Sequence, residues 1–259
     1  MLYVVVALAL INCVIENLSY AAMLAGVQMQ RLSVAQSIYK LMVLVAGVCM
    51  AIQTPVLFSL ADDAVASRAV NDLVDWIRIV LAARLMGYAA GVMVLPHGAR
   101  LIRFGIDVVE HKLAALRALT PRRVLNALRQ DTITAAYNLA DAVTQPIPAH
   151  ILTTAILVAA IYIVVDVAAL YASVLSPERV RTAIGLPTIV KGLGTIIFVL
   201  VIEPFSSLRI DRANGGDIPV SRVVNLTTWL AIGKAGGAAL TQLLFMPITQ
   251  AIIKLSLLV

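Results

Sequence analysis

Charged side chains are scarce in this chain. Asp, Glu, Lys and Arg make up 13 % of its 259 residues, whereas hydrophobic residues make up 61 %. Soluble domains have about 25 % charged and about 45–50 % apolar residues, so this chain has too little polar surface to face water. The composition therefore excludes a soluble globular enzyme, a nucleic-acid-binding domain and a disordered tail. It predicts a polytopic membrane protein.

Cysteine and histidine are also rare. Cys13 and Cys49 lie in apolar runs and are too few to form a disulfide framework. The three histidines are scattered along the chain, so we expect no metal site and no cofactor. The sequence also lacks HExxH, a GxSxG elbow and the paired aspartate-rich motif of prenyl-diphosphate enzymes, so we expect no catalytic residue.

Six apolar stretches are long enough to cross a bilayer, which takes about 20 residues. They are residues 2–24, 32–57, 77–95, 149–172, 183–202 and 223–245. No Lys or Arg precedes the first stretch, as a signal peptide would require, so we interpret it as a retained spanning helix. The sequence thus predicts an all-α transmembrane bundle, with residues 1–259 as one membrane domain. The tail beyond Pro247 either extends the last helix with a kink or lies at the interface.

Basic residues gather after the first, third and fifth stretches. They are Arg31; Arg100, Arg103, Lys112, Arg117, Arg122, Arg123 and Arg129; and Arg209, Arg212 and Arg222. The positive-inside rule places these loops in the cytoplasm and leaves both termini outside. The loop after the second stretch, with Asp62 and Asp63, would then be an exposed outer loop.

The segment 98–147 is the largest part that is not expected to span. Its first half has apolar residues at helical spacing with charged residues between them, which is typical of an amphipathic interfacial helix. Pro121 is expected to begin a second helix. The segment either attracts anionic lipid head groups or is a positive-inside loop that only fixes topology, and the sequence favours neither.

Each predicted span contains one ionisable residue at depth. These residues are Glu16, Lys40, Arg84, Asp166, Lys191 and Lys234. A charge near the bilayer centre costs at least about 2.5–3.5 kcal/mol, so six of them indicate an internal polar cavity or mutual pairing. Four cations against two carboxylates leave two surplus positive charges, and a phosphate or diphosphate would satisfy them. The alternative is a set of structural ion pairs with one or two snorkelling lysines.

Glycines flank two of these lysines. The stretches are Lys191-Gly192-Leu193-Gly194 and Gly233-Lys234-Ala235-Gly236-Gly237. The GxxxG spacing of Gly233 and Gly237 permits two helices to approach closely. The alternative is a local helix break that lets backbone groups line a cavity.

Short motifs in order along the chain resemble the Amj family of bacterial lipid II flippases, an alternate to the MurJ type. They are Ile15-Glu16-Asn17-Leu18-Ser19-Tyr20 with Leu24-Ala25-Gly26-Val27, Gln53-Thr54-Pro55, Glu203-Pro204 with Ser207-Leu208 and Asp211, and the stretch from Gly237 through Gln242 with Pro247. They run from the first predicted span to the last. The chain departs from the family pattern at Met23 and Gly47, where arginine is common, and at Lys40, where a neutral polar residue is usual.

The resemblance implies a flippase that moves lipid II across the bacterial cytoplasmic membrane. We expect Arg84, Lys191 and Lys234, with Lys40 as a further candidate, to bind the diphosphate. Glu16 and Asp166 would pair with these cations in the unloaded state or couple to protons. The expected partners are lipid II and membrane lipids, and no nucleic acid is expected.

Three alternatives stay open from the sequence. One is a transporter of another anionic polyprenyl-phosphate lipid or a small anionic solute. Another is a membrane enzyme acting on a lipid phosphate, which would need a nucleophile or metal ligands beside the cations. The last is a membrane scaffold that transports nothing. Neutralising its buried charges in pairs would leave its biological activity intact.

Overall fold

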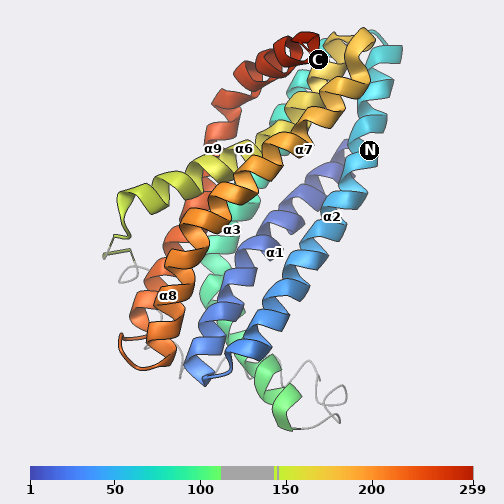
Figure 1. Ribbon diagram of the computed structural model, residues 1–259. Coiled ribbons are helices and arrows are strands. Elements are labelled where there is room, and N and C mark those ends of the chain that lie inside the picture. The colour runs from blue at the N-terminus through green and yellow to red at the C-terminus, as the bar shows by residue number, and fades with distance from the viewer. Residues whose placement is uncertain (112–142, 145, 259) are drawn as a thin grey trace.

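A computed structural model describes residues 1–111, 143–144 and 146–258 of the chain (Figure 1). Helices account for nearly all of these residues, and no strand occurs among them. In chain order they are α1 (Leu2–Met29), α2 (Leu32–Ala66), α3 (Val70–His111), α6 (Ala149–Leu175), η3 (Pro177–Arg179), α7 (Val180–Ile197), η4 (Phe198–Ile202), α8 (Glu203–Asn214) and α9 (Ser221–Leu258).

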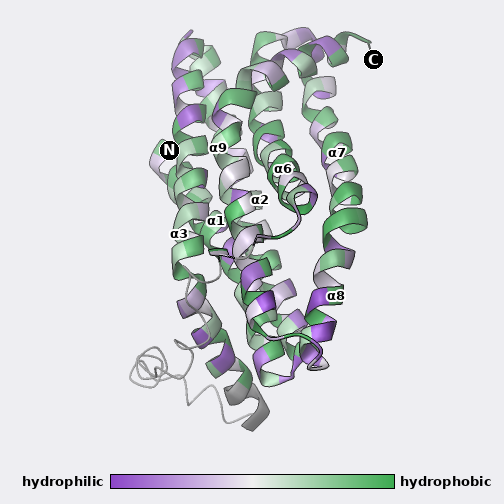
Figure 2. Cartoon of the chain, turned by 90° about the vertical axis from the view of Figure 1, so that its left-hand side faces the viewer, coloured by the Kyte–Doolittle hydropathy of each residue, from purple (hydrophilic) through white to green (hydrophobic). Residues whose placement is uncertain are grey.

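Six of the described helical segments are long and apolar enough to cross a membrane. The short helix η3, helix α7, the π-helical turn η4 and helix α8 form one continuous segment from Pro177 to Asn214. Figure 2 shows hydrophobic residues along most of the length of the helices, with polar residues gathered at α8 and at the neighbouring end of α3. The predicted all-α fold with six spans is confirmed, and the protein is a multi-pass membrane protein.

The helices are longer than the stretches predicted from hydropathy. Asp62 and Asp63 are exposed as predicted, but they lie in the last turns of α2 rather than in a loop. Helix α3 runs without a break through residues 98–111, which therefore continue the third spanning helix instead of beginning a separate segment. A helix need not end where it leaves the hydrocarbon, since its backbone hydrogen bonds are made within the helix itself. The rest of the basic segment, with the helix predicted after Pro121, lies outside the described residues.

The six segments form two groups of three helices. In the first group α1 packs against both α2 and α3, and in the second α6 packs against both α7 and α9, while α3 and α9 join the groups. Glycine allows the closest contacts in each group. A Cβ at Gly87 of α3 would lie 2.6 Å from the Leu10 carbonyl oxygen of α1, and one at Gly237 of α9 would lie 2.7 Å from the Ile156 carbonyl oxygen of α6. The close approach predicted from the Gly233 and Gly237 spacing is therefore present between α6 and α9.

The two groups repeat the same order of helices in opposite directions. Figure 1 shows α1 and α6 running in opposite senses along the bundle, and the same holds for α2 against α7 and α3 against α9. The order of charges repeats as well, as carboxylate, lysine, cation: Glu16, Lys40 and Arg84 in the first group, then Asp166, Lys191 and Lys234 in the second. This is the arrangement of the inverted-topology repeats found in many transporters.

The last helix continues through Pro247 to Leu258, which agrees with the first of the two alternatives for the tail, an extension of the last helix. Its final part turns across one end of the bundle in Figure 2, in keeping with the backbone hydrogen bond that proline removes. Both termini lie toward this end in Figure 1, whereas the α1–α2 and α8–α9 turns lie at the other end.

Candidate functional site

A cavity of about 360 Å³ lies between the two groups of helices. Residues of α1, α2 and α3 line it from the first group, and residues of α6, α7, η4 and α9 line it from the second. Most of its walls are apolar, including Ala46, Val158 and Leu230. This volume is in the lower part of the range of small-molecule sites, roughly 300–1,000 Å³.

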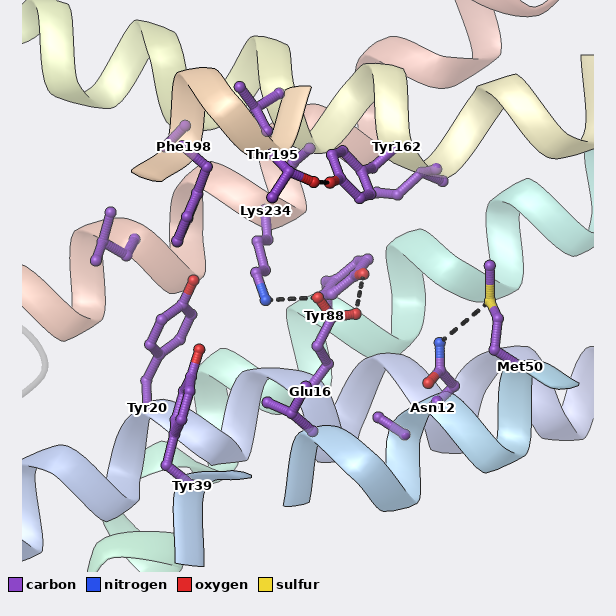
Figure 3. A pocket seen from close by; sticks show the side chains of 18 residues that line it. Asn12, Glu16, Tyr20, Tyr39, Met50, Tyr88, Tyr162, Thr195, Phe198 and Lys234 are labelled. Carbon is purple, nitrogen blue, oxygen red and sulfur yellow. Dashed lines mark hydrogen bonds and ion pairs between the residues drawn. The ribbon is translucent and has the colours of Figure 1, made fainter. Parts of the chain in front are cut away.

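An ion pair between the two groups lies in this cavity. The Lys234 amine of α9 is 2.6 Å from Glu16 Oε1 of α1, and the Tyr88 hydroxyl of α3 donates a hydrogen bond of 2.7 Å to Glu16 Oε2 (Figure 3). The Lys234 amine also lies over the Tyr20 ring, 4.8 Å from its centroid. Three helices thus hold one carboxylate and one ammonium group in the wall of an apolar cavity, where their attraction is stronger than in water.

Asn17 fixes the position of these helices. Its side-chain amide donates 2.8 Å and 3.5 Å hydrogen bonds to the carbonyl oxygens of Tyr88 in α3 and Ala231 in α9. Asn17 is fully buried and lies one residue from Glu16, while Ala231 precedes Lys234 by three residues. The amide therefore ties together the backbones that carry the three side chains of the ion-pair site.

Arg84 places a second positive charge close to this pair. Its side chain is buried, and it donates a 2.7 Å hydrogen bond from Nη1 to the Ile163 carbonyl oxygen of α6. Nη2 lies 3.8 Å from the Met50 sulfur, and Nε has no hydrogen-bond partner among the described residues. Arg84 acts electrostatically on Glu16, which already has Lys234 as its direct partner. Two cations against one carboxylate leave this region with a net positive charge.

The second predicted carboxylate also pairs with a cation. The Lys191 amine of α7 lies 2.5 Å from Asp166 Oδ2 of α6, and neither residue lines the cavity. The pair is nevertheless connected to the cavity wall, because the lining residues Tyr162 and Thr195 both donate 2.9 Å hydrogen bonds to the Lys191 carbonyl oxygen. The Tyr162 and Thr195 hydroxyls also contact each other.

The six predicted charged residues therefore lie at different positions relative to the cavity. Glu16 and Lys234 line the cavity, Arg84 lies beside it, and Asp166 of α6 pairs with Lys191 of α7 outside the cavity lining. Lys40 is exposed on α2 and does not line the cavity. The binding roles expected for Arg84, Lys191, Lys234 and Lys40 stay predictions.

Four tyrosines line the cavity, and the sequence reasoning did not single them out. They are Tyr20, Tyr39, Tyr88 and Tyr162. Figure 3 shows Tyr20 and Tyr39 side by side at one end of the site, with Asn12 and Met50 at the other. Their position inside the apolar spans could have indicated a role, because tyrosine in a membrane protein is enriched at the interfaces rather than in the middle of a span. Each tyrosine supplies a hydroxyl that can bind a polar head group and a ring that tolerates the apolar wall.

No group of three or more His, Cys, Asp or Glu side chains in the described part of the chain is arranged to hold a metal ion. The site is thus built from one ion pair, a buried arginine and tyrosine hydroxyls. Such a set of groups suits the reversible binding of an anion with hydrogen-bonding oxygens.

Comparisons with known proteins find a relative and a family. A curated relative from Bacillus subtilis (strain 168), named "Lipid II flippase Amj", is 24 % identical over 238 residues, which cover 90 % of this chain and 88 % of the relative. No solved structure matches the chain. The model of the Amj family, described as "Alternate to MurJ", matches residues 8–256. A match over nearly the whole chain shows that this protein belongs to the Amj family.

Proposed function

We propose that the protein is a lipid II flippase and that its central cavity binds the diphosphate of the lipid. The membership of the Amj family and the name of the Bacillus subtilis relative support lipid II as the substrate. The observation that carries the binding site is the Glu16–Lys234 pair, which places an ammonium group in a membrane-embedded cavity and beside a buried arginine.

The ion pair gives the cavity a way to bind and release an anion. While Lys234 is paired with Glu16, its charge is neutralised. An arriving diphosphate competes for the ammonium group, and Arg84 adds attraction that Glu16 does not cancel, because two cations share this one carboxylate. Release restores the pair, so the Lys234 ammonium group has an anionic partner at both stages. A proton taken up by Glu16 would favour the loaded state.

The cavity volume sets a limit on what is bound in this conformation. About 360 Å³ is enough for a diphosphate, whereas the disaccharide-peptide head of lipid II is too large for this cavity. The two groups of helices must therefore move apart during transport. Two inverted groups around a central site provide for alternating opening toward the two leaflets.

We propose the bacterial cytoplasmic membrane as the location, with both termini outside. The turns after the first and fifth spans and the far part of α3 lie at the end opposite the termini. They carry Arg31, Arg100, Arg103, Arg209, Arg212 and Arg222. The positive-inside rule places that end in the cytoplasm.

Flipping by the purified protein tests the proposed function. In liposomes that contain the protein and fluorescent lipid II, we expect lipid II to reach the outer leaflet far faster than in protein-free liposomes. Unlabelled lipid II should compete, and the chain should rescue cells depleted of their other lipid II flippases. Stronger competition by another polyprenyl-phosphate lipid would favour the transporter alternative, and release of phosphate from undecaprenyl diphosphate would favour the enzyme.

Arg84→Met separates the binding role of this arginine from a structural one. Methionine has a similar length, but the change leaves the Ile163 carbonyl oxygen without the hydrogen bond from Arg84, which costs about 1–3 kcal/mol. We therefore expect a melting temperature in detergent lower by about 2–12 °C, together with a loss of flipping of about tenfold or more when the variant is assayed below that temperature. A variant that melts normally and flips lipid II at the wild-type rate would remove Arg84 from the site.

A further inference from the structure

The exposed residues of the cavity lining lie on two helices. Most of the residues that line it are buried or half-buried, including Glu16, Tyr88 and Lys234. The exposed ones are Val43 and Gly47 of α2 and Thr195 of α7. The mouth of the cavity therefore lies between α2 and α7.

The surroundings of this mouth are hydrocarbon-like. Helix α2 exposes Leu44 and Val48 to 64 % and 51 %, and α7 exposes Leu193 and Ile196 to 59 % and 54 %. These residues lie in the apolar spanning windows of their helices, which are the least buried of the six. Side chains of this kind at this depth face lipid tails. A cavity that contains an ion pair thus opens sideways into the bilayer core.

The packing of the two helices allows this mouth to widen. Helix α2 packs mainly on α1, and α7 packs mainly on α6, whereas α2 and α7 make few contacts with each other at most. Gly47 leaves open space at the mouth, since a Cβ there would meet no atom within 4 Å. The two helices also occupy equivalent places in the two inverted groups, so either one can move without breaking the α3–α9 junction between the groups.

We infer that the gap between α2 and α7 is a lateral portal that holds the polyprenyl chain of the lipid while its diphosphate lies at Lys234. The inference rests on the proposed function. A water-soluble anion would have to cross hydrocarbon to enter through this mouth, at the cost of its hydration. A molecule with a charged end and a long apolar chain enters from the bilayer with its chain still in lipid. The portal thus explains how one cavity serves a charged head and an apolar tail.

Reversible bridging of the portal tests this inference. The starting protein is Cys13→Ala/Cys49→Ala, which removes both native thiols, with Val43→Cys and Thr195→Cys added. Bifunctional disulfide-forming reagents of graded length then join the two helices. Each sample is compared with itself before bridging and after reduction. We expect the flipping of lipid II in liposomes to fall to the protein-free rate on bridging and to recover on reduction.

A matched pair of glycine variants tests the same mouth of the cavity without cross-linking. Gly47→Trp fills the open space at the portal, and Gly192→Trp adds the same bulk to an exposed position of α7 that does not line the cavity. We expect Gly47→Trp to slow flipping by about tenfold or more because the bulk blocks the chain. Gly192→Trp should stay within about twofold of wild type, since it meets no described atom.

Photolabelling identifies the occupant of the portal. Undecaprenyl diphosphate with a diazirine on its isoprenoid chain should label peptides from 32–66 and 180–202, and unlabelled undecaprenyl diphosphate should prevent this labelling. Equal prevention by phospholipid would mean that ordinary acyl chains fill the gap, and the inference would fall. Undiminished flipping by the bridged protein would also overturn the portal while leaving the proposed function intact. Absence of flipping by the unbridged, wild-type protein would instead contradict the proposed function.

Discussion

Lys234→Ala is expected to abolish the rescue of cells that are depleted of their other lipid II flippases. The change removes the ammonium group that lies 2.6 Å from Glu16 and leaves that carboxylate with the Tyr88 hydroxyl as its direct hydrogen-bond donor. The site then has one cation, Arg84, to set against both Glu16 and an incoming diphosphate. Losing a charge-assisted contact of about 1.5–3 kcal/mol and adding a bare carboxylate should lower flipping by about a hundredfold or more.

Lys254→Ala is the matched control, because it removes a lysine from the same helix at an exposed position outside the cavity. It should rescue like wild type. Immunoblotting of the membrane fraction checks that the two variants accumulate equally. Full rescue by Lys234→Ala at normal abundance would show that the Glu16–Lys234 pair is structural.

Gly237→Leu is expected to have the largest effect on stability. A Cβ at this position would already lie 2.7 Å from the Ala159 Cβ and 2.8 Å from the Ala160 backbone nitrogen, so α6 and α9 would have to separate. Overpacking of a rigid contact costs about 1–3 kcal/mol or more. A loss of about 3 kcal/mol corresponds to a melting temperature lower by about 6–12 °C, measured in detergent by intrinsic fluorescence.

Gly192→Leu provides the comparison for this effect. Its Cβ would meet no described atom within 4 Å, and leucine is the better helix former by up to about 1 kcal/mol. The melting temperature of this variant should be unchanged or slightly higher. If Gly237→Leu melts at the wild-type temperature, the α6–α9 contact is looser than its backbone distances indicate.

The number of spanning helices could be predicted from the sequence, whereas their ends could not. Length and hydropathy decide whether a stretch can cross the bilayer, and both are local properties that the sequence contains. Helix ends depend on capping and on packing beyond the hydrocarbon. Helix α3 therefore runs to His111, well past Leu95, where the stretch predicted from hydropathy ends.

The charged residues of the site could be predicted from the sequence, but the ion pairs that they form could not. One ionisable residue in each span was a strong sign, because each is costly in lipid. The pairing of Glu16 with Lys234 joins residues 218 positions apart, and it follows from the contact of α1 and α3 with α9. The composition of the chain does not indicate which of its helices lie in contact. The tyrosines of the cavity were missed for a related reason, since tyrosine in an apolar span is equally compatible with packing against a neighbouring helix.

In the proposed mechanism the Lys234 ammonium group exchanges Glu16 for a diphosphate. This exchange is tested by the affinity of the purified Glu16→Gln protein for undecaprenyl diphosphate, measured by calorimetry in detergent. Glutamine keeps the shape of the side chain and removes the charge that competes with the ligand, so binding should be about tenfold tighter than in wild type. Lys234→Ala should bind more weakly under the same conditions. Affinity of Glu16→Gln that is equal to wild type, or lower, would contradict the exchange.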